Sequence, residues 1–161
     1  PGMRRVPFMK LTDALLGEHA VLYALFDHLR DTTLESDDMA EIHGVRAVVE
    51  KLLASHARIE DELLFPQLEP HLGPMGPLAV MRAEHSAIDD LLAAAGQESD
   101  IAALKDLIGQ LLELAHGHFQ KEEMVLFGMA RQCLDEATLT GLADEWAARR
   151  NVTGLDHTGA A

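Results

Sequence analysis

The sequence predicts an all-α protein, in detail an up-down-up-down four-helix bundle followed by a short fifth helix at its C-terminal end. Leu, Ala and Glu dominate the 161 residues, and aromatic residues make up only 4%, which is a helical composition. No stretch shows the sustained alternation of apolar and polar residues that a strand requires. Instead, apolar residues recur at intervals of three and four, which places them along one face of a helix.

The first two helices are predicted around residues 15–29 and 45–63, where this repeat is continuous. Thr12 or Asp13 can cap the first of them, and a residue of the segment 36–38 can cap the second. The second helix should end near Pro66 to Pro70, because proline removes a backbone hydrogen-bond donor.

The third and fourth helices are predicted around residues 78–92 and 101–129. A connection rich in Pro and Gly precedes the third, and Ser99 or Asp100 can cap the fourth. A shorter amphipathic segment at 136–149 predicts the fifth helix. We therefore divide the chain into an N-terminal arm (1–10), a four-helix bundle (11–132), a C-terminal helix (133–150) and a mobile tail (151–161).

The charge balance restricts the partners of the chain. Lys and Arg number 13 against 27 Asp and Glu, which gives a formal net charge of −14. Nucleic acids and anionic membranes require a basic face, so we expect neither as a partner, while a homodimer remains open. Cys133 is the only cysteine and no apolar run is long enough to span a membrane, so we expect a cytoplasmic protein without an internal disulfide.

Polar residues interrupt the middle of each apolar stripe. Each of the four long helices carries one histidine there: His19, His56, His85 and His118. Glu60 and Glu122 follow two of these histidines by four residues, so each His-x3-Glu pair lies on one helical face. Unpaired buried carboxylates and imidazoles destabilise a core. A pair of divalent cations would compensate, with each glutamate bridging both ions and each ion taking two imidazoles.

An internal repeat supports this interpretation. The segment EHAVL (18–22) resembles EHSAI (84–88), and HARIEDELLF (56–65) resembles HFQKEEMVLF (118–127). Two similar helical hairpins, packed with pseudo-twofold symmetry, would each contribute one histidine and one His-x3-Glu pair. The sequence therefore predicts a binuclear metal site at the centre of the bundle.

The order His, His-x3-Glu, His, His-x3-Glu on four helices resembles the hemerythrin-like, or HHE cation-binding, family over residues 11–129. The resemblance implies two non-haem iron ions, with manganese or zinc as possible substitutes. It gives the four histidines as terminal ligands and Glu60 and Glu122 as bridges. Asp89 stands where the oxygen carriers of the family have a further histidine. Either the site has six protein ligands or Asp89 supplies a carboxylate, and both alternatives favour peroxide, nitric oxide or sensing chemistry over reversible oxygen carriage.

The expected function is therefore that of a di-iron protein that interacts with O2, peroxide or NO. The alternatives are a di-iron enzyme that decomposes peroxide or reduces a small oxidant, and a protein of iron handling or repair.

Several further residues lie close to the candidate ligands in the sequence. Tyr23 could reach the site, although we expect it rather to pack at the edge of the bundle. Five carboxylates are expected mostly to face solvent, with one or two orienting an imidazole: Glu18, Asp61, Glu62, Glu84 and Glu123. Glu123 is also a spare ligand candidate. The other histidines are expected at the surface: His28, His43, His71, His116 and His157. Cys133 is expected to be an inert thiol.

Overall fold

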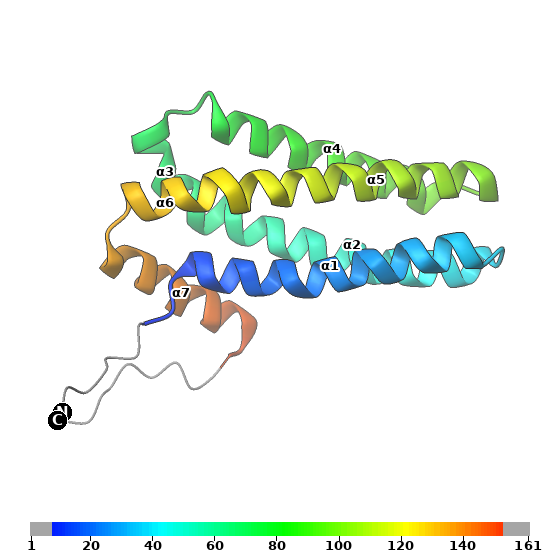
Figure 1. Cartoon of the computed structure of the whole chain (residues 1–161), viewed down its shortest axis with the longest axis horizontal. Coiled ribbons are helices and arrows are strands. Elements are labelled where there is room, and N and C mark those ends of the chain that lie inside the picture. Colours follow the sequence, from blue (N-terminus) through cyan, green and yellow to red (C-terminus); the bar gives the residue numbers. More distant parts are fainter. Residues whose placement is uncertain (1–7, 153–161) are drawn as a thin grey trace.

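The computed structural model describes residues 8–152, and these form helices without any strand. Two long rods are composite: α2 (Met39–Ile59), η1 (Glu60–Leu64) and α3 (Phe65–Leu72) follow one another without a loop, as do α5 (Ile101–Lys121), η2 (Glu122–Leu126) and α6 (Phe127–Cys133). The remaining helices are α1 (Leu11–Glu35), α4 (Pro77–Gln97) and α7 (Glu136–Arg150). The prediction of a four-helix bundle with a short fifth helix is confirmed (Figure 1).

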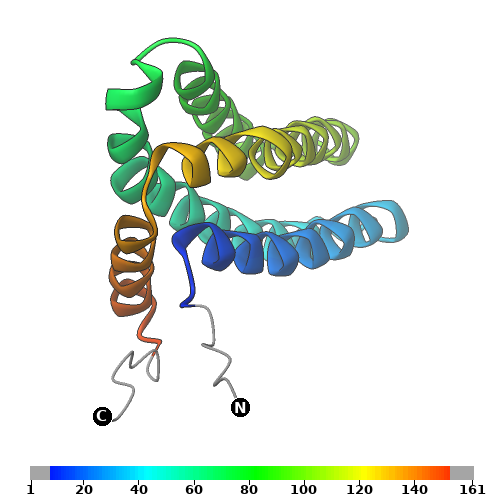
Figure 2. The ribbon, with the colours of Figure 1, turned by 60° about the vertical axis from the view of Figure 1, so that its left-hand side comes forward.

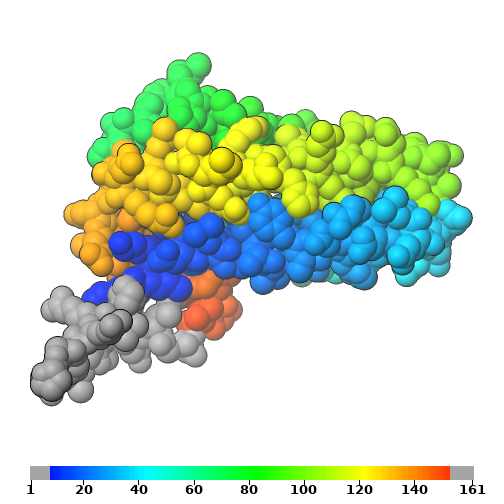
Figure 3. All heavy atoms as spheres, viewed as in Figure 1, coloured from blue at the N-terminus to red at the C-terminus, as the bar shows by residue number. Residues whose placement is uncertain are grey.

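The four rods form a closed ring in which each contacts two neighbours. Helix α1 packs on α2 and α5, and α4 packs on the same two helices. The connecting loops are short, at residues 36–38, 73–76 and 98–100, so consecutive rods run antiparallel. The space-filling view shows α1 and α5 side by side along one face (Figure 3). The predicted arm (1–10) and tail (151–161) lie mostly outside the described residues.

The predicted helix caps are right at two of three helices. The carboxylate of Asp38 accepts a hydrogen bond from the N–H of Ala40 (2.9 Å), and that of Asp100 accepts one from Ala103 (2.9 Å). The prediction for the first helix is wrong, because α1 already begins at Leu11 with Lys10 as its cap residue. Asp13 instead acts from inside the first turn, where its carboxylate accepts the N–H of Lys10 at 3.0 Å.

The apolar core is divided into two clusters. One surrounds Leu15, Ile59 and Met81, and the other surrounds Leu22, Leu53 and Ile88. Along each rod, a candidate histidine ligand lies where one cluster ends and the other begins, for example His19 between Leu15 and Leu22. The six polar residues therefore form a layer that is sealed by apolar side chains on both sides.

The two glutamates of this layer begin π-helical turns. The N–H of Phe65 donates to the carbonyl oxygen of Glu60, and that of Phe127 donates to Glu122, each five residues back along the chain. A π turn inserts an extra residue into a helix and is frequent at functional sites. Both hairpins carry this irregularity at the equivalent residue, which agrees with the internal repeat.

Helix α7 lies across the bundle near the start of α1 (Figure 2). Its residues Leu139 and Leu142 are buried in the same apolar cluster as Leu11 and Leu15, and Trp146 packs against that cluster. Among residues 8–152, no helix combines the length and the apolar character that a membrane span needs.

Candidate metal centre

The six predicted residues meet in the middle of the bundle. The four histidines come from four different helices, α1, α2, α4 and α5, and all are buried. Glu60 and Glu122, at the first positions of η1 and η2, have no exposed side-chain surface. The convergence of these six residues follows from the sequence, because each histidine sits on the apolar stripe of its helix and each glutamate follows a histidine by one turn. Their role as metal ligands stays a prediction.

The histidines are arranged as two pairs. The Nε2 atoms of His19 and His56 are 3.1 Å apart, and those of His85 and His118 are 3.0 Å apart. A hydrogen bond could join two neutral imidazoles at this distance. However, each of these Nε2 atoms also lies 3.1–3.3 Å from an oxygen of Glu60 or Glu122. Facing nitrogens of this kind are the arrangement expected of two ligands that share one ion.

Each glutamate spans the two histidine pairs. Glu60 places Oε1 3.3 Å from Nε2 of His56 and Oε2 3.3 Å from Nε2 of His85. Glu122 does the same with Oε1 3.1 Å from His118 and Oε2 3.2 Å from His19. Two four-residue clusters result, with ligand atoms within 4.8 Å of one another, and both glutamates belong to both clusters.

The site fits a pair of metal ions on two grounds. Within the described part of the chain, none of the four oxygens of Glu60 and Glu122 accepts a hydrogen bond of good geometry, although each lies near an imidazole. Buried carboxylates left in this way are destabilising unless a cation compensates them. In addition, two ligands at right angles, each about 2.1 Å from one ion, lie about 3.0 Å apart. The observed separations of 3.0–3.3 Å match this spacing.

A second layer of carboxylates holds the outer side of every imidazole. Each Nδ1 atom faces one carboxylate oxygen, which fixes the ring orientation and leaves Nε2 to face the centre. The pairs are His19–Glu123 (2.8 Å), His56–Glu18 (2.7 Å), His85–Asp61 (3.2 Å) and His118–Glu84 (2.9 Å). The prediction of one or two such partners was too low. Glu62, which the sequence did not distinguish from Asp61, instead pairs with Arg149.

The charges of the layer follow from these contacts. Burial lowers the pKa of His56, but the charge of Glu60 and the hydrogen bond to Glu18 outweigh it and raise that pKa to about 10. The pKa of His85 also rises to about 10, because Asp61 and Glu60 outweigh its burial. The pKa of Glu60 lies well below its ordinary value, since His56 and His85 outweigh the effect of burial. In the metal-free protein, the protonated forms of His56 and His85 therefore compensate part of the negative charge of Glu60.

Three further residues that the sequence offered as possible members of the site lie outside both four-residue clusters. Asp89 is exposed, one turn after His85, and Glu123 contacts Nδ1 of His19 rather than the centre. Tyr23 packs edge-on against Phe119, and its ring centroid is 6.3 Å from that of His19. Burial and the neighbouring Glu123 raise the pKa of Tyr23 to about 12.

Two adjoining cavities, together called the passage, border the layer on the side of Asp89. A cavity of about 10 Å³ is lined by three of the histidines, His56, His85 and His118, together with Asp89. A wider groove of about 320 Å³ outside it shares His85 and Asp89. The inner cavity is about large enough for one water molecule, so only very small molecules can reach the histidines this way.

The remaining histidines and the cysteine lie away from the centre. His28 and His71 are exposed as predicted, whereas His43 and His116 are half-buried, the latter stacked on Tyr23. Cys133 is a half-buried free thiol. The prediction for His157 lies outside the described residues.

Comparison with known proteins places this arrangement in a family. The family model of the hemerythrin HHE cation-binding domain matches residues 10–98, which include four of the six clustered residues. A protein of Nostoc sp. (strain PCC 7120) named DNA nickase is 27% identical over 144 residues, which are 89% of this chain. They are 40% of that relative, so the chain spans less than half its length. No solved structure matches significantly. This chain belongs to the hemerythrin HHE cation-binding domain family.

Proposed function

We propose that this chain is a non-haem di-iron protein that interacts with O2, peroxide or NO. The observation that carries the proposal is the placement of Glu60 and Glu122, each of which offers its two oxygens to two different histidine pairs. In this proposal, His19 and His56 would hold one ion, His85 and His118 would hold the other, and Glu60 and Glu122 would contribute to both positions. The iron pair would supply the redox chemistry.

The protein would control that chemistry through access and orientation. The two apolar clusters exclude water above and below the layer, and the outer carboxylates hold the imidazoles in place. The cavity beside His85 and Asp89 is about the size of one water molecule, so it excludes bulky substrates on this side. These features support a diatomic molecule or peroxide as the ligand.

Elemental analysis of protein purified from its native host tests the metal assignment. Imidazole and carboxylate ligands also suit manganese and zinc, so the ligand set alone does not select iron. We expect about two iron ions per chain. A preparation that contains one zinc ion and no iron would contradict the proposal.

A peroxide-decomposing enzyme is the second candidate, and the position of Asp89 favours it. Because Asp89 is exposed beside His85 and outside both clusters, the His85–His118 position has no fifth ligand from the described residues, and it faces the passage. Addition of peroxide to the ferric protein, with oxygen release followed by an electrode, tests the enzyme. A visible band that forms in air and vanishes on degassing would favour a carrier instead. Loss of iron to a chelator during either experiment would favour iron handling.

Replacement of Asp89 by histidine tests the geometry of the passage. The new imidazole, one helical turn from His85, comes within reach of the His85–His118 position, so we expect a shifted visible spectrum of the iron-loaded protein. Asp90→His is the matched control, because Asp90 is also exposed but lies about 100° further around the helix. Identical spectra for Asp89→His and the unmodified protein would place residue 89 out of reach of the metals.

The name of the Nostoc relative does not extend to this chain in our proposal. The chain spans 40% of that protein, and its net charge of −14 does not provide a basic surface for a phosphate backbone. We propose a cytoplasmic protein that binds neither nucleic acid nor membrane. In a gel-shift experiment at low salt, we expect addition of the protein to leave the mobility of duplex DNA unchanged.

A further inference from the structure

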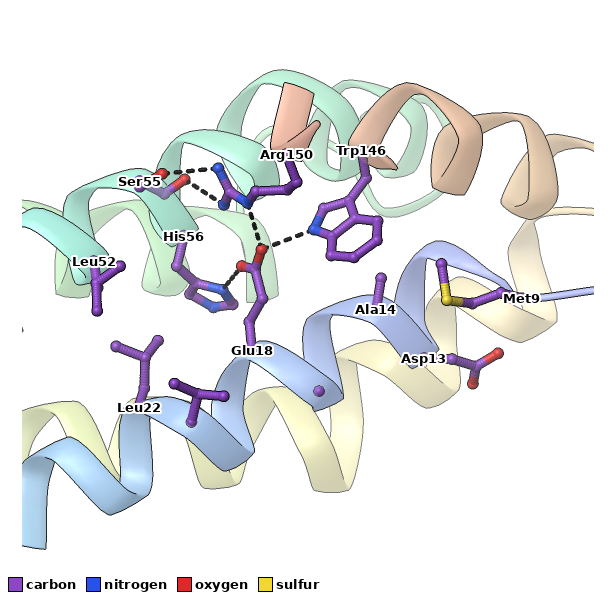
Figure 4. A pocket seen from close by; sticks show the side chains of 12 residues that line it. Met9, Asp13, Ala14, Glu18, Leu22, Leu52, Ser55, His56, Trp146 and Arg150 are labelled. Atoms are coloured by element: carbon purple, nitrogen blue, oxygen red, sulfur yellow. Dashed lines mark hydrogen bonds and ion pairs between the residues drawn. The ribbon is translucent and has the colours of Figure 1, made fainter. Parts of the chain in front are cut away.

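Helix α7 reaches the metal centre through one carboxylate. Glu18 uses Oε2 to accept the Nδ1–H of His56 (2.7 Å), and it uses Oε1 to accept hydrogen bonds from two residues of α7. These are the indole N–H of Trp146 (2.7 Å) and the Nε–H of Arg150 (2.7 Å), which converge on Glu18 in Figure 4. Two residues of α7, both more than 125 positions away in sequence, therefore hold the Glu18 carboxylate in place behind His56.

Arg150 is itself held in place. Its two terminal nitrogens donate to the hydroxyl (2.8 Å) and the carbonyl oxygen (3.0 Å) of Ser55, the residue before His56. A guanidinium that binds a carboxylate and a backbone carbonyl together has little rotational freedom. Arg150 thus connects α7 to both α1 and α2 at the level of His56 (Figure 4). Trp146 also forms one wall of a groove of about 460 Å³ between these helices.

Within residues 8–152, the other half of the centre has no such brace. By the internal repeat, Glu84 corresponds to Glu18 and His118 to His56. Among the described residues, Glu84 pairs with His118 and with Lys121, whose side chain is 52% exposed. Gly117, which has no side chain, stands at the position that corresponds to Ser55. An exposed lysine contributes much less fixation than the part-buried network of Glu18, Trp146 and Arg150, because it is flexible and screened by solvent.

We infer that Trp146 and Arg150 are positioning residues for His56 and that they make the two metal positions unequal. The ion held by His19 and His56 binds more tightly, and the ion held by His85 and His118 binds more weakly, beside the passage. This inference rests on the proposed pair of metal ions. It assigns a function in the centre to α7, a helix that lies outside the segment matched by the family model.

Titration of the metal-free protein with Co²⁺ tests the inference, with binding followed by visible absorption. We expect two binding steps for the unmodified chain. The tighter step should also change the fluorescence of Trp146, which is the only tryptophan. Arg150→Met should weaken the tighter step by up to about 10-fold and leave the other unchanged, because it frees Glu18 without removing it, whereas losing an outer partner of a ligand outright costs about 10- to 100-fold. Arg150→Lys should restore part of the affinity.

Two matched variants separate positioning from general stability. Arg149→Met removes a neighbouring arginine of α7 that pairs with Glu62 and Glu145, and it should leave both steps unchanged. Lys121→Met removes the corresponding partner in the other half, and we expect an effect below that of Arg150→Met. If Arg150→Met fails to fold, Trp146→Phe replaces it, because phenylalanine retains the ring packing and removes the N–H donor.

The outcomes distinguish the inference from the proposed function. Fewer than two bound Co²⁺ in the unmodified chain would contradict the binuclear centre itself. Two Co²⁺ with the same affinities in the unmodified chain, Arg150→Met and Trp146→Phe would leave the centre intact and overturn the role of α7. Equal weakening by Arg149→Met and Arg150→Met, or by Lys121→Met and Arg150→Met, would also overturn it.

Discussion

Replacing Glu60 with glutamine is expected to reduce the metal content from two ions per chain to one or none. An amide has one oxygen for two ions, and its NH2 group would face an imidazole or a cation. Loss of an outer partner alone lowers metal affinity by about 10- to 100-fold, so loss of a bridging oxygen should exceed this. Because bound metal stabilises the folded state, the thermal stabilisation gained on loading should shrink in parallel. Metal analysis after dialysis, together with thermal unfolding, measures both effects.

Glu62→Gln provides the control for this variant. Glu62 lies on the same π-helical turn as Glu60, but it pairs with Arg149 at the surface. The Glu62→Gln variant should retain two ions per chain and the thermal stability of the unmodified protein. Glu122→Gln should behave like Glu60→Gln, because the two residues are equivalent in the internal repeat. Two ions per chain in both Glu60→Gln and Glu122→Gln would refute the bridging role.

The stability of the metal-free protein should fall as pH rises from about 6.5 to about 10. The pKa values of His56 and His85 are about 10 in the fold and 6.5 in the unfolded chain, so folding favours their protonated forms. Their contribution is fully present below pH 6.5 and is lost as pH rises through 10. The loss should be on the order of 5 kcal/mol for each histidine, since each tenfold change in proton affinity corresponds to about 1.4 kcal/mol.

At acid pH, the stability of the metal-free protein should instead rise with pH. The pKa of Glu18 falls from 4.5 to about 2, because hydrogen bonds from His56, Arg150 and Trp146 outweigh its burial. Its contribution is present above pH 4.5 and is lost as pH falls toward 2. Urea unfolding between pH 3 and 10 in the presence of a chelator measures the whole curve, with a maximum expected between pH 4.5 and 6.5. The metal-loaded protein should become more stable above pH 6.5, because metal ions require neutral imidazoles. Stability that rises with pH in the metal-free protein as well would contradict the assignment.

The bundle and its six central residues could be predicted because both depend on local periodicity. A histidine such as His85 replaces an apolar residue without breaking the spacing of three and four, so its burial follows from the stripe. The i and i+4 spacing of His56 and Glu60 then places both side chains on one face. The repeat between the two hairpins supplied the pairing of the halves.

The outer carboxylates could not be predicted because their partners depend on how helices pack against one another. Glu123 contacts His19 across 104 positions, and Arg150 contacts Glu18 across 132. Nothing in the spacing distinguishes Asp61, which faces His85, from Glu62, which faces α7. The π-helical turns were missed because the apolar repeat of the sequence runs on through Val125, whereas the structure buries Leu126 and leaves Val125 exposed. The N-terminal cap was misassigned because Asp13 acts backward on Lys10.

Anomalous diffraction from crystals of the iron-loaded protein, recorded at the iron absorption edge, tests the central claim most directly. The account predicts two peaks inside the bundle. One should lie between the imidazoles of His19 and His56, the other between those of His85 and His118, and both should contact Glu60 and Glu122. A single peak, peaks on the outer surface, or a glutamate turned away from both ions would contradict it.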